Sequence, residues 1–286
     1  MTETPDACYV PLSSRTDDSG RRTEEFLATP HTASAWNGAD QHGGPVAALL
    51  TRALEQCEAR EQTRLSRITV EILGGVPVGE VALTAWVERP GRRIELIRAE
   101  MSAAGPDGQR RTVAAASAWR LRTTPTEEAL THAESPLPPA PSQDAPGNGA
   151  SVLPKPWQAG FVLALDWHPC ELPGAAGGPS GAWLRMRHPL VAGEETTPTQ
   201  RAMAVADTAN GVGARIDTRQ FTFLNTELTV HLYEPPTGVW VGLRAETSAG
   251  RDGVGLSAGT LHSASGPIGR VSQNLLVERR RTATGG

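Results

Sequence analysis

The chain contains 286 residues, with 27 basic and 31 acidic side chains and a formal net charge of −4. Hydrophobic residues make up 38% of the chain and charged residues 20%, which excludes a wholly disordered protein. No segment approaches the roughly 18 apolar residues of a membrane span, and the acidic start, MTETPDACYV, does not resemble a signal peptide. We therefore expect a cytoplasmic protein with neither a membrane nor, at this charge, a nucleic acid as partner.

Several kinds of site are excluded by residue spacing. The cysteines at 8, 57 and 170 form no CxxC pair, and the 7 histidines show no HxxxH spacing, so we expect no disulfide framework and no metal. The chain contains neither a GxSxG nucleophile motif nor a GxxxxGK[ST] phosphate loop. The sequence therefore indicates no serine hydrolase of the α/β type and no cofactor.

The first half of the chain predicts one helix followed by strands. Apolar residues recur at helical spacing over 45–57, directly after His42-Gly43-Gly44. Strand-like segments follow at 64–73, 80–89, 92–103 and 109–121, separated by Gly and Pro. This order predicts a sheet wrapped around a buried helix, whose other side needs a further layer of structure.

A segment rich in Pro, Gly and Ser, including PLPPAPSQDAPGNGAS, divides the chain. We expect residues 125–157 to form an exposed linker with few core contacts, between an N-terminal unit at 1–124 and a C-terminal unit at 158–286. The second unit has a short apolar segment at 161–168 and a predicted helix near 199–210. Its predicted strands lie near 219–233, 239–248, 253–261 and 267–278, and the glycine-rich stretch 174–181 predicts a flexible loop.

The two units repeat one another. Residues 68–73 read ITVEIL and residues 228–233 read LTVHLY, an offset of 160. Further matches follow at nearly the same offset, namely 77–79 with 236–238, 91–92 with 250–251, and 116–117 with 271–272. Matches in one register indicate a duplicated domain. We expect the two units to be related by a pseudo-twofold axis, with their sheets joined.

This pattern resembles the hotdog fold, and two units in one chain resemble the double-hotdog acyl-CoA thioesterases, the bacterial thioesterase II group and its actinobacterial relatives. The resemblance covers roughly 25–122 and 158–280 and is carried by Trp36-Asn37-Gly38, His42-Gly43-Gly44, Pro189-Leu190-Val191, Ala206-Asp207-Thr208, Phe223 to Thr229 and Ser272 to Leu276. It implies an α+β double hotdog, with two tandem units that each wrap a long antiparallel sheet around a central helix.

The resemblance also implies a set of catalytic residues. In that family a helix Asp, a strand Thr and a final-strand Gln together hold the water that attacks the thioester. Asp207 matches the Asp and Gln273 matches the Gln, whereas the Thr position falls on Asn225, with Thr226 adjacent. The first unit carries Ala118 where the repeat places Gln273, so one complete site is expected.

Each of these residues also has a structural interpretation. A buried carboxylate in MAVADTANG needs hydrogen bonds or a function, and Asp207 could instead cap the turn that follows its helix. Gln273 lies on an apolar strand face, where its amide could serve a cross-strand hydrogen bond. We expect the N–H of Gly43 or Gly44 to polarise the substrate carbonyl at the helix N-terminus, with His42 as a wall or hydrogen-bonding neighbour.

Three functions remain open on these residues. The first is hydrolysis of an acyl-CoA or an acyl-carrier-protein thioester in fatty acid or polyketide metabolism. The second is an enoyl-thioester hydratase or dehydratase, which needs an Asp and a His suitably spaced, and no His is near Asp207 in the sequence. The third is a non-catalytic protein that binds acyl thioesters. Because a duplicated unit already contains its own pseudo-dimer, a homo-oligomer remains open.

Overall fold

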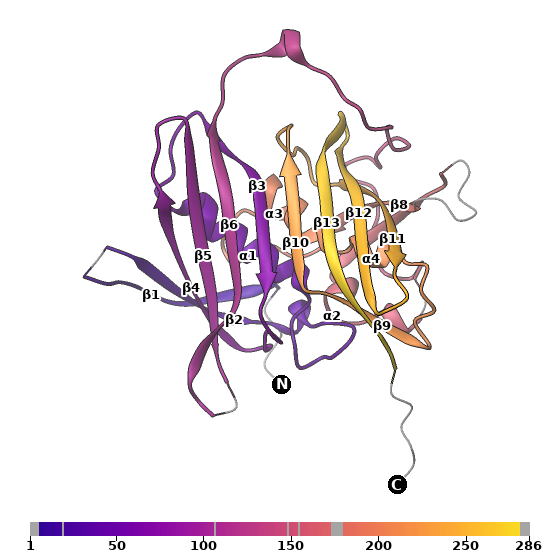
Figure 1. Ribbon diagram of the computed structural model, residues 1–286, viewed down its shortest axis with the longest axis horizontal. Coiled ribbons are helices and arrows are strands. Elements are labelled where there is room, and N and C mark those ends of the chain that lie inside the picture. The colour runs from indigo at the N-terminus through magenta and orange to yellow at the C-terminus, as the bar shows by residue number, and fades with distance from the viewer. Residues whose placement is uncertain are drawn as a thin grey trace.

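The computed structural model describes residues 6–280, except 19, 106, 148, 154 and 173–179. Within these residues a single antiparallel sheet of 13 strands runs through both units (Figure 1). The N-terminal unit contributes β1 (Tyr9–Thr16), β2 (Arg22–Ala28), β3 (Thr63–Ile72), β4 (Glu80–Arg89), β5 (Ile94–Ala104) and β6 (Arg110–Arg122). The C-terminal unit contributes β7 (Leu165–Cys170), β8 (Ser180–Met186), β9 (Phe221–Asn225), β10 (Glu227–Leu232), β11 (Val241–Ala249), β12 (Val254–Ser263) and β13 (Gly266–Arg279).

The described residues contain fewer helices than strands. The helices are α1 (Gly43–Gln56), α2 (Gly160–Leu163), α3 (Pro198–Ala206) and α4 (Ala209–Val212), with 3-10 turns η1 (Pro30–Thr32), η2 (Glu127–Ala129) and η3 (Lys155–Trp157). The predicted helices at 45–57 and 199–210 are therefore present, although the second divides into α3 and α4 around Asp207. Strands β1, β2 and β8 were not predicted. The outward side chains of β1 are largely polar, so it lacks the apolar alternation that marks a half-buried strand.

The two units join through β3 and β10, which pair antiparallel at the centre of the sheet. Thr69 lies directly opposite Thr229, its counterpart in the repeat, and their hydroxyl oxygens are 3.1 Å apart. When a residue on one antiparallel strand faces its own repeat, a twofold axis passes between the two strands. The expected pseudo-twofold relation and the joined sheets are thus confirmed.

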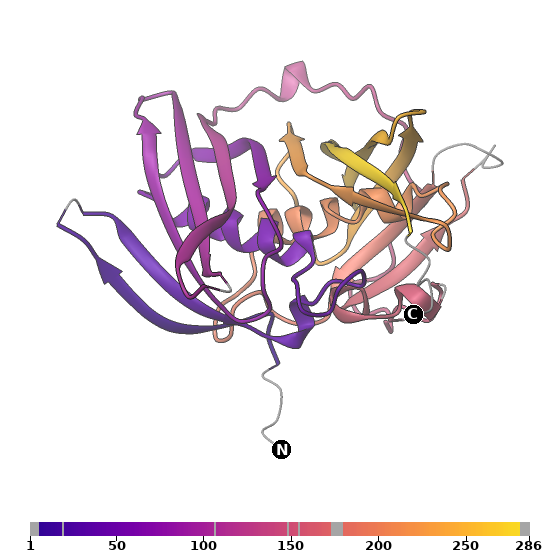
Figure 2. The ribbon, with the colours of Figure 1, turned by 60° about the horizontal axis from the view of Figure 1, so that its bottom comes forward.

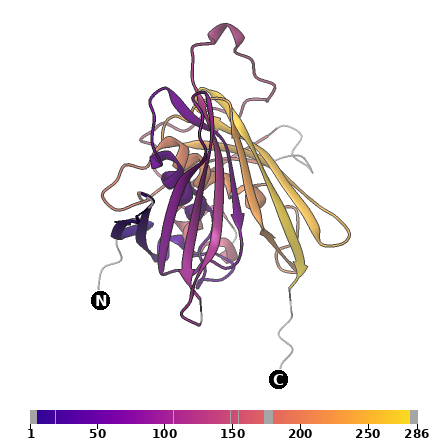
Figure 3. The same ribbon diagram turned by 60° about the vertical axis from the view of Figure 1, so that its left-hand side comes forward.

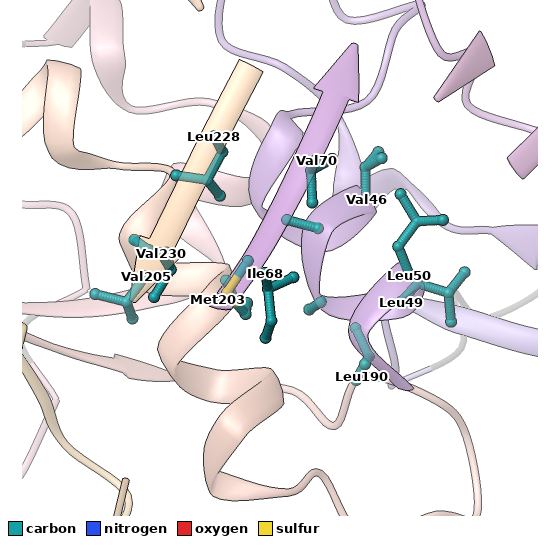
Figure 4. Packing of buried hydrophobic residues seen from close by; sticks show 14 of the residues in the cluster. Val46, Leu49, Leu50, Ile68, Val70, Leu190, Met203, Val205, Leu228 and Val230 are labelled. Carbon is teal, nitrogen blue, oxygen red and sulfur yellow. The ribbon is translucent and has the colours of Figure 1, made fainter. Parts of the chain in front are cut away.

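The central helices fill the space on one side of this sheet (Figures 2 and 3). Every residue of α1 from Gly44 to Leu54 is buried, because α1 packs against strands β3 to β6 and also against α3. A helix that is enclosed on all sides can be apolar all round. Figure 4 shows Val46 and Leu50 of α1 beside Ile68 and Val70 of β3, and Met203 of α3 close by. The sibling unit therefore supplies the layer that each helix lacks.

The proline-rich segment arches over one end of the molecule before it reaches the C-terminal unit (Figures 1 and 2). It is largely exposed, but the expectation of few contacts is wrong. The indole N–H groups of Trp183 and Trp240 donate to the carbonyl oxygens of Pro138 and Ser142, each at 3.0 Å. Extended proline-rich backbone forms no internal hydrogen bonds, which leaves carbonyl groups such as that of Pro138 available to an indole donor. The Ser142 carbonyl oxygen also accepts from the Ala145 N–H at 3.0 Å, so it serves two donors. The predicted loop at 174–181 lies outside the described residues except for 180 and 181, which begin β8.

Candidate active site

Asp207 lies at the interruption between α3 and α4 and is 2% exposed. Its Oδ1 accepts a hydrogen bond of 2.7 Å from Asn225 Nδ2 and one of 3.3 Å from Gln273 Nε2. Its Oδ2 lies 2.9 Å from His42 Nδ1. The carboxylate therefore does not cap the following turn, and its contacts come from three other elements.

The negative charge of Asp207 faces the start of α1. A Cβ atom added to Gly43 would lie 2.7 Å from both carboxylate oxygens, so only glycine permits this approach. The positive end of the α1 dipole, carried by the N–H groups of its first turn, stabilises an anion at this place. Gly43 thus has a structural purpose that the sequence did not reveal, namely to admit the carboxylate.

His42 is the N-cap of α1, and its Nδ1 accepts from the Gly44 N–H at 3.0 Å. The same nitrogen faces Asp207, although a ring nitrogen holds either a proton or a lone pair at one time. When unprotonated it accepts from Gly44, and when protonated it donates to Asp207. His42 also lines the cavity, so its position is compatible with both roles that the sequence suggested, a wall and a hydrogen-bonding neighbour. The Gly44 N–H is engaged by this cap while Nδ1 is unprotonated, and of the two glycines Gly43 lines the cavity whereas Gly44 does not.

The structure separates Asn225 from Thr226. Asn225 ends β9 with its side chain on the inner face, toward Asp207. Thr226 is exposed, and its backbone joins neighbouring strands by accepting from Ile72 N–H and donating to Asn274 O, each at 3.0 Å. Thr226 is thus not brought to the site, because the alternation of side chains along a strand assigns the two residues to opposite faces.

Gln273 lies behind Asp207 and is fully buried on β13. Besides its bond to the carboxylate, its Nε2 donates to the Asp207 backbone oxygen at 3.0 Å. Its Oε1 accepts from the Asn210 N–H of α4 at 2.9 Å. This side chain holds both ends of the interruption between α3 and α4, and it does not line the cavity.

The cavity beside Asp207 has a volume of about 650 Å³ and is lined by residues of both units. His42, Gly43, Asp207 and Asn225 contribute polar atoms to its wall. Most of the remaining wall is apolar, from residues such as Val46, Ile72, Val162, Trp167, Ala182 and Val212. A largely apolar cleft with a few convergent polar groups is the usual form of a small-molecule site.

Three tryptophans, Trp36, Trp157 and Trp167, form part of this wall, and none of them was predicted as a site residue. Trp36 and Trp157 pack edge to face at 4.9 Å between ring centroids, and both contact Phe223. The Trp167 indole N–H donates to Val162 O at 3.0 Å, which fixes the orientation of that ring. Only 5% of the chain is aromatic, so three tryptophans in one cavity are a concentration that the linear sequence hides.

The corresponding position of the first unit lacks the amide. Thr69 pairs with Ser117 as Thr229 pairs with Ser272, so the next residues, Ala118 and Gln273, occupy equivalent positions. Ala118 has no group that could hold a helix carboxylate. This asymmetry supports a single complete site.

Metal-ligating side chains also occur elsewhere in the described residues. Asp6, His31 and His188 have ligand atoms within 4.8 Å of one another, and the two imidazole rings stack with centroids 3.9 Å apart. None of these three lines the cavity.

Within the described residues, no helix combines the length and the apolar character needed to cross a membrane.

Comparison with known proteins decides the family. The family model for the acyl-CoA thioesterase N-terminal domain matches residues 32–121, and the model for the acyl-CoA thioesterase C-terminal domain matches residues 134–277. The chain belongs to the acyl-CoA thioesterase family. A comparison with curated protein sequences found no match.

Solved structures show the same fold. A protein of unknown function with a hot dog fold from Alicyclobacillus acidocaldarius is 16% identical and covers 96% of this chain and 98% of its own, with a TM-score of 0.67. An acyl-CoA thioesterase II, TesB2, from Mycobacterium marinum is 14% identical and covers 96% of this chain and 97% of its own, with a TM-score of 0.61. The expected double hotdog is confirmed. Membership of the thioesterase family supports thioester hydrolysis in general terms.

Proposed function

We propose that this thioesterase-family protein hydrolyses acyl-CoA thioesters at the cavity beside Asp207. The observation that carries the proposal is a buried carboxylate on the wall of an apolar cavity, beside the N-terminus of a 14-residue helix. A carboxylate in this position can accept a proton from water, and backbone N–H groups at a helix start can stabilise an oxyanion. Both groups needed to hydrolyse a thioester are therefore adjacent.

The reaction follows from these groups. A water molecule in the cavity gives a proton to Asp207 while its oxygen forms a bond to the thioester carbonyl carbon. The Gly43 N–H stabilises the negative charge that develops on the carbonyl oxygen, because Gly43 lines the cavity and Gly44 does not. Collapse of the intermediate breaks the carbon–sulfur bond, and the departing thiolate takes the proton back from Asp207. The products are a carboxylic acid and a thiol.

Asn225 and Gln273 act by positioning in this proposal. Both donate hydrogen bonds to Asp207 Oδ1, which fixes the carboxylate and leaves Oδ2 toward His42. Asn225 also lines the cavity, so its amide can contact the attacking water, as the threonine at this position is expected to do in related thioesterases. Gln273 has no access to the cavity and acts through Asp207.

A hydratase or dehydratase is the second candidate, because the structure reverses the sequence argument against it. His42 is remote from Asp207 in the chain but lies 2.9 Å from it in space. Proton transfer at two adjacent carbons, however, requires an acid and a base that address the substrate separately. Here Asp207 and His42 Nδ1 are turned toward one another, which favours hydrolysis.

The deciding experiment measures thiol release from acyl-CoA esters of increasing chain length, with Asp207→Asn as the test variant. Loss of the base should lower kcat by about 10²–10⁴-fold. Asp166→Asn is the matched control, because Asp166 is also buried but pairs with Arg185 outside the cavity. Its kcat should stay near that of the wild type, whatever its effect on stability.

Three outcomes would contradict the proposal. A folded Asp207→Asn protein with near-normal turnover would remove Asp207 from the reaction. Water addition to crotonyl-CoA without thiol release would indicate the hydratase. Saturable binding of acyl-CoA with no reaction at all would indicate a binding protein.

Parallel assays with acyl-carrier-protein esters show whether a carrier protein also serves as the acyl donor.

A further inference from the structure

Arg280 lies at one end of the cavity, directly after β13. Its Nε donates a 2.7 Å hydrogen bond to the backbone oxygen of Thr218, and its guanidinium carbon lies 5.3 Å from the centroid of the Trp36 ring. Thr218 and Trp36 both line the cavity. The guanidinium is thus held in place by two wall residues, although Arg280 itself is exposed.

The positive charge of Arg280 has no acidic partner among the described residues, and its two terminal nitrogens donate to no protein atom there. The nearest candidate along the chain, Asp217, is already engaged by Arg219 Nε at 3.0 Å and by Gln220 Nε2 at 3.1 Å. These hydrogen bonds, those from Arg219 first, lower the pKa of the Asp217 carboxyl to about 2. The guanidinium fork of Arg280 is therefore free to receive an anion from solvent.

The cavity leads from Asp207 toward this arginine. Its wall follows β9 backward from Asn225 through Leu224 to Thr218, and β9 runs alongside the stretch of β13 that ends at Arg279. Among the residues that the structure describes, no lysine or arginine lines the cavity itself. Arg280 is the cation held against the wall at this end, so an anionic group on a ligand that extends from Asp207 would meet it.

The separation fits a phosphopantetheine arm. Between Gln273 and Arg280 the strand advances seven residues, or about 23 Å at a rise of roughly 3.3 Å per residue. The arm has about thirteen bonds between its sulfur and its phosphorus, equivalent to between four and five residues of extended chain, or about 15 Å. The thioester lies beyond the Gln273 and Asp207 side chains, and the Arg280 side chain reaches back toward the cavity. Both contributions shorten the distance that the arm must span.

We infer that Arg280 binds the phosphate of the phosphopantetheine arm that carries the acyl group. The inference rests on the proposed thioesterase function. It also orients the substrate in the cavity, with the carrier at the end near Arg280 and Trp36 and the acyl group toward Trp167 and Ala182. A planar guanidinium with two free nitrogens matches the bidentate geometry of phosphate recognition. The residue selects the carrier and takes no part in the chemical step.

The experiment compares one acyl group on three carriers, namely pantetheine without phosphate, 4′-phosphopantetheine, and coenzyme A. The test variant is Arg280→Met, which keeps an apolar stem over Trp36 and removes the charge. Its KM should rise about tenfold for both phosphorylated carriers, with kcat unchanged, while the pantetheine ester should be hydrolysed as by the wild type. The KM of Arg280→Lys for the phosphorylated carriers should lie between that of the wild type and that of Arg280→Met.

The matched control is Arg279→Met. Arg279 carries the same charge one residue earlier but lies over the Phe221 ring, 5.0 Å from its centroid. It should change KM less than twofold for every carrier. Equal losses on pantetheine and phosphopantetheine esters, or no loss on either, would overturn the assignment of Arg280. If the wild type hydrolyses none of the three esters, the proposed function itself fails, and the two results are therefore distinguishable. An acyl-carrier-protein substrate added as a fourth arm shows whether the same phosphate is recognised when a protein bears it.

Discussion

Replacement of Gly43 by alanine gives the sharpest structural test of the site, because it adds one methyl group at a known place. The new Cβ would lie 2.7 Å from both Asp207 carboxylate oxygens, against an ordinary contact of 3.4–4 Å. Asn225 and Gln273 hold the carboxylate from the other side, so it cannot retreat without breaking hydrogen bonds. We expect the carboxylate to shift by about 0.7 Å or more, or the start of α1 to move by a similar amount.

Displacements of this size matter more for rate than for stability. A misplacement of about 1 Å near the reacting atoms costs roughly 10²-fold in rate, so kcat should fall between about 10- and 100-fold. Alanine is favoured over glycine in a helix by about 0.5–1 kcal/mol, which offsets part of the steric cost. The free energy of unfolding should therefore change by less than about 1 kcal/mol.

The assay combines thiol release with urea unfolding of the same variant. Gly79→Ala is the control, because no atom lies within 4 Å of its added Cβ and Gly79 does not line the cavity. Its kcat should match that of the wild type. If Gly43→Ala retains full turnover, the close approach of Asp207 to the helix start is not needed for catalysis, and the N–H groups of the helix start do not stabilise the transition state.

Two further predictions concern buried polar groups. Gln273→Ala removes hydrogen bonds to Asp207 and to Asn210 N–H, so it should lower the free energy of unfolding by about 1–3 kcal/mol. It should also lower kcat, by less than Asp207→Asn does. An unchanged stability would show that Gln273 does not hold the helix interruption. His262 is buried under the proline-rich segment near Ser135, and burial lowers the pKa of its imidazole below the ordinary 6.5. In the unfolded chain this imidazole binds a proton more readily than in the folded protein. The free energy of unfolding should therefore be highest above about pH 6.5 and decline as the pH falls. Urea unfolding at two pH values should show a smaller decline for His262→Gln than for the wild type.

Local sequence patterns determined most of the secondary structure. The helical spacing before Cys57 and the alternating segments that follow predicted α1 and strands β3 to β6 to within a few residues. The offset of 160 between the repeats identified Thr69 and Thr229 as equivalent residues, and the structure then paired them. These patterns can be recognised in a single sequence because each depends on residues that are neighbours along the chain or on a duplicated segment.

The tertiary structure alone decided how the site is assembled. Whether Asn225 or Thr226 faces Asp207 depends on the bend at Thr226 that separates β9 from β10. A shift of one residue in the strand register would exchange the faces of the two side chains. His42 meets Asp207 only because helices of different units lie side by side, and Gly43 is required only because a carboxylate from the other unit approaches it. The contacts of the proline-rich segment likewise depend on indole donors far along the chain. Hydrophobic periodicity specifies which face of an element is buried, whereas the partner that covers this face is fixed by long-range packing.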